Sequence, residues 1–286
     1  MDPILELRGV TKHYAGFSLR AMSFSLPRGY VCGLIGPNGA GKTTIVKMIL
    51  GLVRPERGEL RVCGDDPATA EQAVKDRIGF VHEVPAYYDH LRVGAVASIV
   101  RPFYSGWDQP LFETLVREFE VPTGTRFGSL SRGTRTKAAL ALALAHHADL
   151  LVLDEPTAGL DPVFRRSLLE RLAAYVEDGR ASVLFSTHLT SDLERMADYV
   201  TFIRDGRLVF SSTREDLADR WFLVKGDPRT LDASIRQGLA GVEVGPHAFT
   251  GLTNEPAAIR QLLAGRDAVI EAASLEDIMY YAGRSC

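Results

Sequence analysis

The sequence predicts an α/β fold organised around a mainly parallel sheet, and three observations support this. Residues 150–153 form an unbroken apolar run, which is typical of a strand buried on both faces of a sheet, and residues 182–186 predict another buried strand. Predicted strands and helices alternate along the chain, which favours parallel pairing. A glycine-rich loop, residues 36–44, joins a predicted strand to a predicted helix. Ligands of such sheets bind at the carboxyl ends of the strands.

The chain begins with elements that suit the edge of a fold. Residues 4–10 alternate between apolar and polar side chains, as an edge strand does. Residues 17–26 predict a further pair of strands, closed by Pro27-Arg28-Gly29. Tyr14 lies between these segments, where its ring could stack on an adenine or could pack at the end of a strand. Residues 58–64 predict a short strand between glycines.

The loop at residues 36–44 predicts a phosphate site. It fits the pattern G-x-x-x-x-G-K-[ST], and it has a predicted strand before it at 30–35 and a predicted helix after it at 45–50. Small residues let the backbone approach a phosphate, and the N–H groups at the start of the helix face the anion. Lys42 can bridge the outer phosphates, and the Thr43 hydroxyl can bind Mg²⁺. The alternative is a glycine-rich turn without a ligand. The predicted binding residues are Gly36, Pro37, Asn38, Gly39, Ala40, Gly41, Lys42, Thr43 and Thr44.

The middle of the chain is mostly helical. Residues 68–76 predict a helix and residues 77–81 a strand that ends at 82–85. Residues 91–120 predict helix, with breaks at Pro102, Gly106 and Pro110. A strong helix is predicted at 135–147, with Ser131 as a candidate N-cap.

Polar residues follow the two buried strands. Asp154 ends the first strand and could hold Mg²⁺, while the adjacent Glu155 could polarise an attacking water. His188 follows the second strand and could contact the γ-phosphate or that water. Taken singly, the three could instead be an acid in a turn, a solvent-facing acid and a core histidine. Between them, Asp161 and Pro162 predict the start of a helix over 162–177.

The last third of the chain carries no chemical motif beyond residue 221. Residues 198–210 predict two short strands around Asp205-Gly206, and residues 213–221 predict a helix. Short strands and helices follow, with a terminal helix at 275–282. We expect one domain over residues 1–221 and a small α+β accessory domain, or dimerisation appendage, over 222–286.

Taken together, these motifs resemble the ATP-binding-cassette (ABC) ATPases over residues 4–221. Residues 36–43 resemble their Walker A motif and residues 150–154 their Walker B motif. Residues 130–134, Leu-Ser-Arg-Gly-Thr, resemble the signature loop, and residues 158–161 resemble the loop that crosses the dimer interface. The resemblance implies a P-loop NTPase core with an antiparallel β edge subdomain and a helical subdomain at about 85–147.

The resemblance also implies roles for individual residues. Glu155 and His188 match the catalytic glutamate and the switch histidine, and they join Lys42 as the catalytic set. Tyr14 matches the adenine-stacking position. Ser131 and Gly133 match signature residues that contact ATP, which would lie between Lys42 of one subunit and Ser131 of another. The implied cofactors are ATP and Mg²⁺, the metal being held by Thr43, Asp154 and Glu83.

Three positions depart from the family pattern. Glu83 stands where glutamine is common, Arg132 replaces a signature glycine, and Thr134 replaces a glutamine. A carboxylate at position 83 can still bind Mg²⁺, although it adds negative charge near the γ-phosphate. Glu83 and Arg132 could equally be ordinary surface charges.

Composition is that of a soluble globular protein, with 46% hydrophobic and 24% charged residues and a net charge of −3. A net charge this small does not indicate a surface that binds nucleic acid. No apolar run is long enough to span a membrane, and residues 1–6 lack a signal-peptide pattern. Three scattered cysteines, Cys32, Cys63 and Cys286, suit a reducing cytosol.

The resemblance therefore implies a cytoplasmic ATPase subunit, peripheral on the cytoplasmic face of the membrane. It would pair with a second identical or paralogous ATPase subunit and power a separate membrane permease. The form of residues 107–109 and 131–134 is similar to exporters. Residues 83–101 would form part of the permease groove or would pack internally. The alternatives are a soluble ABC ATPase not coupled to transport and a weakly catalytic regulatory subunit.

Overall fold

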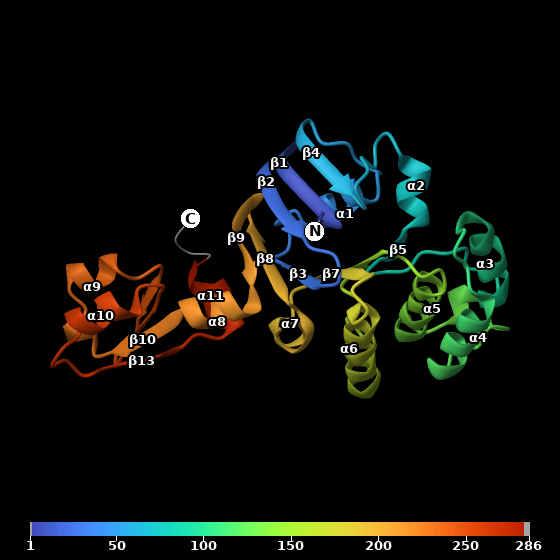
Figure 1. Ribbon diagram of the computed structural model, residues 1–286. Coiled ribbons are helices and arrows are strands. Elements are labelled where there is room, and N and C mark those ends of the chain that lie inside the picture. The colour runs from blue at the N-terminus through green and yellow to red at the C-terminus, as the bar shows by residue number, and fades with distance from the viewer. Residues whose placement is uncertain (1, 283–286) are drawn as a thin grey trace. The chain divides into compact units, whose positions relative to one another are not determined.

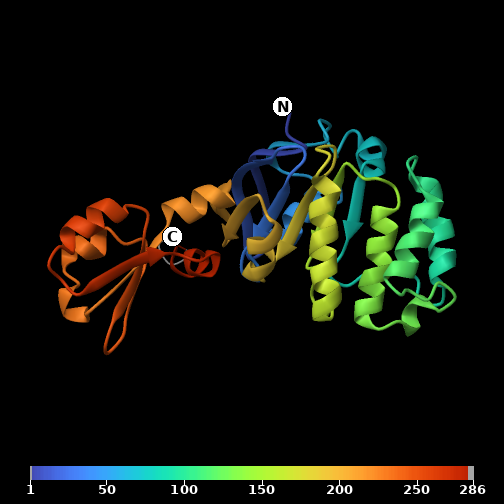
Figure 2. The ribbon, with the colours of Figure 1, turned by 60° about the horizontal axis from the view of Figure 1, so that its bottom comes forward.

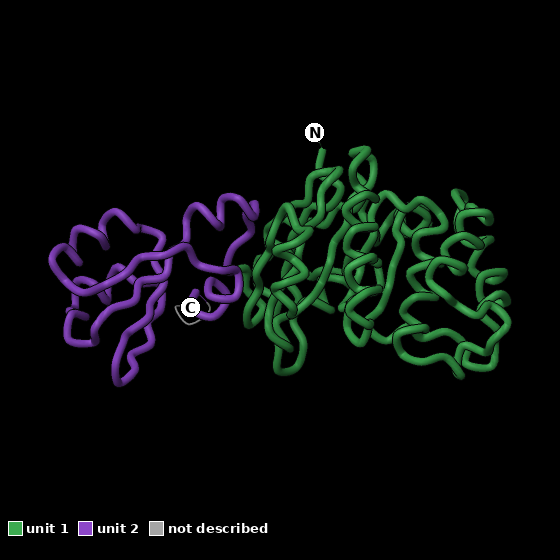
Figure 3. Tube along the Cα trace, turned by 90° about the horizontal axis from the view of Figure 1, so that it is seen from below, with its two compact units in different colours: residues 1–208 green, residues 209–286 purple. Residues whose placement is uncertain are grey.

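The computed structural model describes residues 2–282 and contains two compact units, residues 1–208 and 209–286 (Figure 3). Cys286 lies outside the described residues. Cys32 and Cys63 are free and buried, and burial raises the pKa of each thiol to about 11. Within residues 2–282, no helix is both long enough and apolar enough to span a membrane.

A six-stranded sheet forms the centre of the first unit, and its last strand, β9, continues past residue 208. Its strand order is β5-β6-β7-β3-β8-β9, and the pairs from β5 to β8 are all parallel, which confirms the predicted α/β class. All the residues of β6 and β7 are buried, which confirms the two predicted buried strands. The strands are β3 (Val31–Ile35), β5 (Ile78–Val81), β6 (Leu150–Asp154), β7 (Ser182–Thr187), β8 (Tyr199–Arg204) and β9 (Arg207–Thr213).

A second, antiparallel sheet packs on this core. Its strands are β1 (Leu5–Tyr14), β2 (Phe17–Leu26) and β4 (Arg57–Val62), in the order β2-β1-β4. The interpretation of residues 17–26 as a pair of strands is wrong: they form one ten-residue strand, because alternate side chains face a single core. That core includes Leu19 and Met22 from β2, Ile45 from helix α1, and Leu150 from β6. Figure 1 shows α1 between the two sheets.

Two helices of the first unit begin at residues whose side chains cap them. Ser131 caps α5 through a bond from the Thr134 N–H, and Asp161 caps α6 through a bond from the Phe164 N–H, as predicted. The predicted helix at 91–120 is broken into α3, a short 3-10 turn and α4. Figure 2 shows α3, α4 and α5 grouped together. The helices are α1 (Lys42–Ile49), α2 (Glu71–Asp76), α3 (Val93–Val100), α4 (Gln109–Glu118), α5 (Arg132–Leu144), α6 (Pro162–Val176) and α7 (Thr190–Met196).

The second unit has the order strand-helix-strand-strand-helix-strand after the short helix α8 (Arg214–Arg220). Its antiparallel sheet runs β11-β12-β10-β13, which is the split βαβ arrangement of ferredoxin-like folds. Val224, Ile235, Phe249 and Ile259 form its own core. The elements are β10 (Phe222–Gly226), α9 (Ala233–Gln237), β11 (Val242–Val244), β12 (Phe249–Thr253), α10 (Pro256–Leu262), β13 (Ala268–Ala272) and α11 (Leu275–Ala282).

Candidate active site

The loop between β3 and α1 depends on glycines with no room for a side chain. A Cβ atom on Gly36 would lie 2.3 Å from the carbonyl oxygen of Ile203. Gly41 has φ +111°, and a Cβ there would lie 2.9 Å from the side chains of Leu19 and Phe17. These positions require the smallest residue, so the glycine spacing of the motif is imposed by the fold.

Hydrogen-bond donors of the loop and of the helix that follows it lie close together. Helix α1 begins at Lys42, so the N–H groups of its first turn have no partner inside the helix. The Lys42 side chain folds back over the loop and donates to the carbonyl of Gly36 at 2.6 Å and of Pro37 at 3.3 Å. Burial lowers the pKa of the Lys42 ammonium, and the nearby carboxylates of Glu155, Asp154 and Glu83 act in the opposite direction. Backbone dipoles and the ammonium together favour an anion.

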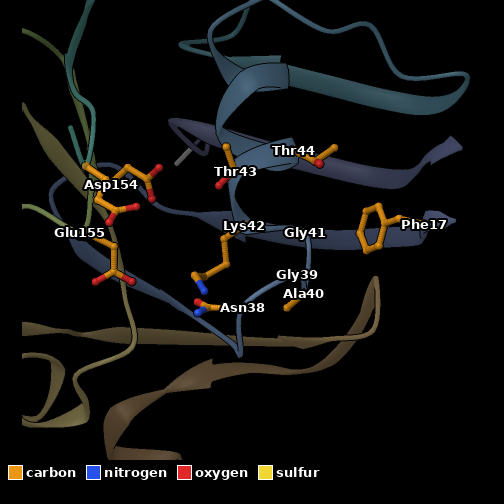
Figure 4. Close-up of a pocket in the computed structure, with 11 residues that line it drawn as sticks. Phe17, Asn38, Gly39, Ala40, Gly41, Lys42, Thr43, Thr44, Asp154 and Glu155 are labelled. Atoms are coloured by element: carbon orange, nitrogen blue, oxygen red, sulfur yellow. The ribbon is translucent and has the colours of Figure 1, made fainter. Parts of the chain in front are cut away.

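These groups line an open pocket of about 250 Å³. In Figure 4, Lys42 and Thr43 project from the start of α1, and Asp154 and Glu155 face them from the end of β6. Phe17 lies at the opposite end of the pocket from Glu155. The lining residues are Phe17, Asn38, Gly39, Ala40, Gly41, Lys42, Thr43, Thr44, Glu83, Asp154 and Glu155.

Glu155 is the most constrained acid of the pocket. Its backbone has φ +49°, which is uncommon for a residue with a side chain, and its N–H donates to the Ser186 carbonyl at 2.8 Å. Both carboxylate oxygens lie 2.9 Å from Nδ1 of His188, and the Thr187 hydroxyl donates to one of them at 3.3 Å. The His188 side chain is 58% exposed, whereas that of Glu155 is only 10% exposed. An acid held this way has the fixed orientation that a general base needs.

The oxygen donors in the pocket fit a magnesium ion that is also bound by phosphate. Thr43, Asp154 and Glu83 supply hard oxygens, and Mg²⁺ is usually held by one or two carboxylates together with substrate phosphates and water. No cluster of three or more His, Cys, Asp or Glu side chains among residues 2–282 could hold a metal by itself. Ser186 pairs in register with Asp154, and its buried hydroxyl has no hydrogen-bond partner in the described structure.

The two charged departures from the family pattern meet in the fold. Nη2 of Arg132 lies 3.3 Å from Oε1 of Glu83, although 49 positions separate them in sequence. Both side chains are about half exposed. No local pattern predicts this contact, because Glu83 follows β5 whereas Arg132 begins α5.

Some predicted residues lie away from the pocket of this chain. Ser131, whose hydroxyl caps α5, and Gly133, where a Cβ would lie 3.3 Å from the Gly159 carbonyl oxygen, are not among the lining residues. Tyr14 is 43% exposed at the end of β1 and is also outside the lining. Phe17, which pairs with Tyr14 across the turn, lines the pocket instead. The sequence signal for Phe17 was an aromatic residue directly after Ala15-Gly16.

Comparisons with known proteins agree with this geometry. The ABC transporter family model matches residues 19–158. The chain is 33% identical to a Nod factor export ATP-binding protein I of Cupriavidus pinatubonensis, over 97% of this chain and 90% of that protein. It is 29% identical to the bacitracin transport ATP-binding protein BcrA of Bacillus licheniformis, over 73% of this chain and 69% of that protein. A solved ATP-binding subunit of an ABC transporter superposes with a TM-score of 0.70 at 29% identity, covering 75% of this chain and 91% of that one.

Proposed function

The chain belongs to the ABC transporter family as an ATP-binding subunit, and from that premise we propose that it hydrolyses ATP with Mg²⁺ to power export through a separate membrane permease. The observation that carries the proposal is the pocket that gathers Lys42, Thr43, Asp154 and Glu155, with Glu155 held by His188. The names of similar proteins, which refer to Nod factor export and bacitracin transport, support the direction of transport.

Each residue has a distinct task in this proposal. Lys42 and the backbone amides of the loop bind the β- and γ-phosphates, and Thr43, Asp154 and Glu83 hold Mg²⁺. The metal, when bound, neutralises charge that develops on the phosphate oxygens. Glu155 accepts a proton from the attacking water, and His188 fixes the Glu155 carboxylate and steadies the transition state. The Glu155–His188 contact at 2.9 Å supports this division of work.

We propose that the working unit is a dimer of ATPase subunits, identical or paralogous, on the cytoplasmic face of a membrane. Ser131 and Gly133 lie outside the pocket of their own chain, so they are available to the nucleotide of a second subunit. Residues 1–221 would act as the ATPase domain, with the helical subdomain at about 85–147, and residues 222–286 as an accessory domain. The segment 83–101 would contact the permease.

ATP turnover tests the enzyme assignment. We expect measurable hydrolysis by the wild type, a loss of about a hundredfold or more in kcat for Glu155→Gln, and loss of nucleotide affinity for Lys42→Ala. Glu170→Gln is a matched control, because Glu170 is an exposed residue of α6 that pairs with Arg166 and does not line the pocket. Normal ATP binding by Lys42→Ala would show that the site is misplaced. Equal and negligible rates for the wild type and Glu155→Gln would favour the regulatory alternative.

Light scattering tests the dimer. Glu155→Gln with ATP and Mg²⁺ should form a dimer, because slow hydrolysis keeps the nucleotide at the interface. Ser131→Ala in the same background should weaken that dimer. A Glu155→Gln protein that binds ATP yet stays monomeric would argue against a self-sufficient sandwich and for a required partner subunit. A pull-down from detergent-solubilised membranes, compared with ribosomes, separates a transporter subunit from a soluble ABC ATPase.

A further inference from the structure

A buried carboxylate lies outside the pocket and has no place in the mechanism above. Asp192 is on the first turn of α7, and its side chain is only 2% exposed. Arg165 of α6 donates to its Oδ1 through Nε at 2.7 Å, with Nη2 at 2.6 Å from the same oxygen. The Thr157 hydroxyl donates to the other oxygen at 2.8 Å. A buried charge with this many directed partners fixes the elements that supply them.

The elements joined by Asp192 are the two that carry the catalytic pair. Thr157 lies two residues after Glu155, and Asp192 lies four residues after His188. The chain after β6 and the chain after β7 are therefore linked twice, by Glu155 to His188 and by Thr157 to Asp192. In the first link, the His188 side chain is 58% exposed to solvent. In the second link, Thr157 is only 3% exposed and Asp192 only 1% exposed.

The loop after Glu155 is held at its two ends: the Glu155 N–H donates to the Ser186 carbonyl of β7 at 2.8 Å, and Oδ2 of Asp161 lies 4.0 Å from Nζ of Lys137 in α5. Its internal bonds run from the Ala158 N–H to the Glu155 carbonyl and from the Leu160 N–H to the Thr157 carbonyl. Both are local, so they shape the loop without fixing it to β7 or α7. Figure 1 shows α6 and α7 side by side, which is the arrangement that brings Arg165 to Asp192.

We propose that Asp192 is a positioning residue for hydrolysis: by holding the Thr157 hydroxyl, it fixes the loop that orients the Glu155 carboxylate against His188. The inference rests on the proposed ATPase function. It concerns the chemical step only, because Asp192 and Thr157 are not among the residues that line the pocket. Nucleotide binding should therefore be independent of this contact.

The test compares kcat with ATP affinity in Thr157→Val, Thr157→Ser and Asp192→Asn, measured on full-length protein that circular dichroism shows to be folded. Thr157→Val keeps the shape of the side chain and removes the donor. We expect it to lower kcat at least about fivefold with unchanged affinity for a fluorescent ATP analogue, since small displacements of catalytic groups cost rate. Thr157→Ser keeps the hydroxyl and should restore most of the rate. Thr201→Val, which removes a buried hydroxyl from β8, is the matched control and should keep kcat.

The double variant, Thr157→Val with Asp192→Asn, should lose less rate than the two single losses combined, because both changes affect the Thr157–Asp192 contact, although Asp192→Asn also alters the pair with Arg165. A purely structural contact would lower the melting temperature and leave kcat of the folded protein at the wild-type value, and that result would overturn the proposal. So would equal rates for Thr157→Val and Thr157→Ser. If Asp192→Asn does not fold, the two Thr157 variants still decide. If the wild type itself shows no hydrolysis, the proposed function fails first, whereas a wild-type rate abolished by Glu155→Gln but unaffected by Thr157→Val rejects this inference alone.

Discussion

The contact between Arg132 and Glu83 leads to a quantitative prediction about the affinity of the pocket for Mg²⁺. In the described structure Glu83 lines the pocket and also pairs with Arg132 at 3.3 Å. If Glu83 binds Mg²⁺, the metal and the guanidinium compete for one carboxylate. Arg132→Gly removes the competitor and restores the residue that the family pattern favours, so it should raise the apparent affinity for Mg²⁺ in the presence of ATP.

The expected size of the rise in Mg²⁺ affinity follows from the solvent exposure of the two side chains. Both side chains are about half exposed, and pairs of this kind contribute about 0–1 kcal/mol, because water screens them. One kcal/mol corresponds to a factor of about five in a binding constant. The rise in Mg²⁺ affinity should therefore not exceed about fivefold, and it should shrink as ionic strength increases, since added salt screens exposed charges.

The assay is a titration of Mg²⁺ at fixed ATP, followed by nucleotide fluorescence, for the wild type, Arg132→Gly, Glu83→Gln and the double variant. Glu83→Gln should weaken Mg²⁺ binding, and Arg132→Gly should have no effect in that background, because the negative charge that holds the guanidinium is gone. Arg166→Gly, which removes a guanidinium from the exposed pair with Glu170, controls for net charge. An increase that persists in the Glu83→Gln background would refute the competition. No change in Mg²⁺ affinity for either single variant would show that Glu83 is not a metal ligand.

Three further predictions follow from the fold. Phe17→Ala should weaken ATP binding, measured by titration, more than Tyr14→Ala does if the pocket-lining ring stacks on the base, a contact worth about 1–3 kcal/mol; the reverse order would favour the family position at Tyr14. Gly36→Ala should destabilise the protein by about 1–3 kcal/mol in urea unfolding, because its Cβ would lie 2.3 Å from the Ile203 carbonyl; an unchanged midpoint would contradict the packing described here. Burial lowers the pKa of His146 from 6.5, so the unfolded chain takes up that proton first as pH falls. Stability should be full above about pH 6.5 and decline below it, and His146→Gln should have a shallower decline; equal slopes would exclude His146 as the cause.

Local sequence predicts the elements of the first unit because their signals are short in range. The apolar runs of β6 and β7 and the caps at Ser131 and Asp161 each depend on a few neighbouring residues. Helix α7 was not predicted, because it has only seven residues and no side-chain cap. Its stability comes from contacts with α6, including the bond from Arg165 to Asp192, which no local pattern contains.

The residues of the pocket, too, could be predicted only where the signal lies in a short stretch of sequence. The glycine-lysine motif and the acids after β6 were visible as types of residue at fixed spacing, and those chemical types were enough to predict an ATP site. The position of Phe17 depends on the turn between β1 and β2, and the Glu83–Arg132 pair joins the loop after β5 to the start of α5, 49 residues apart. Contacts of this kind follow only from the path of the whole chain.

The electrostatics of the pocket explain why these distant contacts bear on function. Three carboxylates, from Glu83, Asp154 and Glu155, act on the single ammonium of Lys42, so the side chains alone would repel a triphosphate. The amides at the start of α1 offset part of this charge, and a bound divalent cation would offset more. Arg132 neutralises the charge of Glu83 as long as no metal ion is bound to the Glu83 carboxylate. A chain that carries glutamic acid at position 83 therefore has a physical reason to carry arginine at position 132, and the two charged departures from the family pattern are best understood as one.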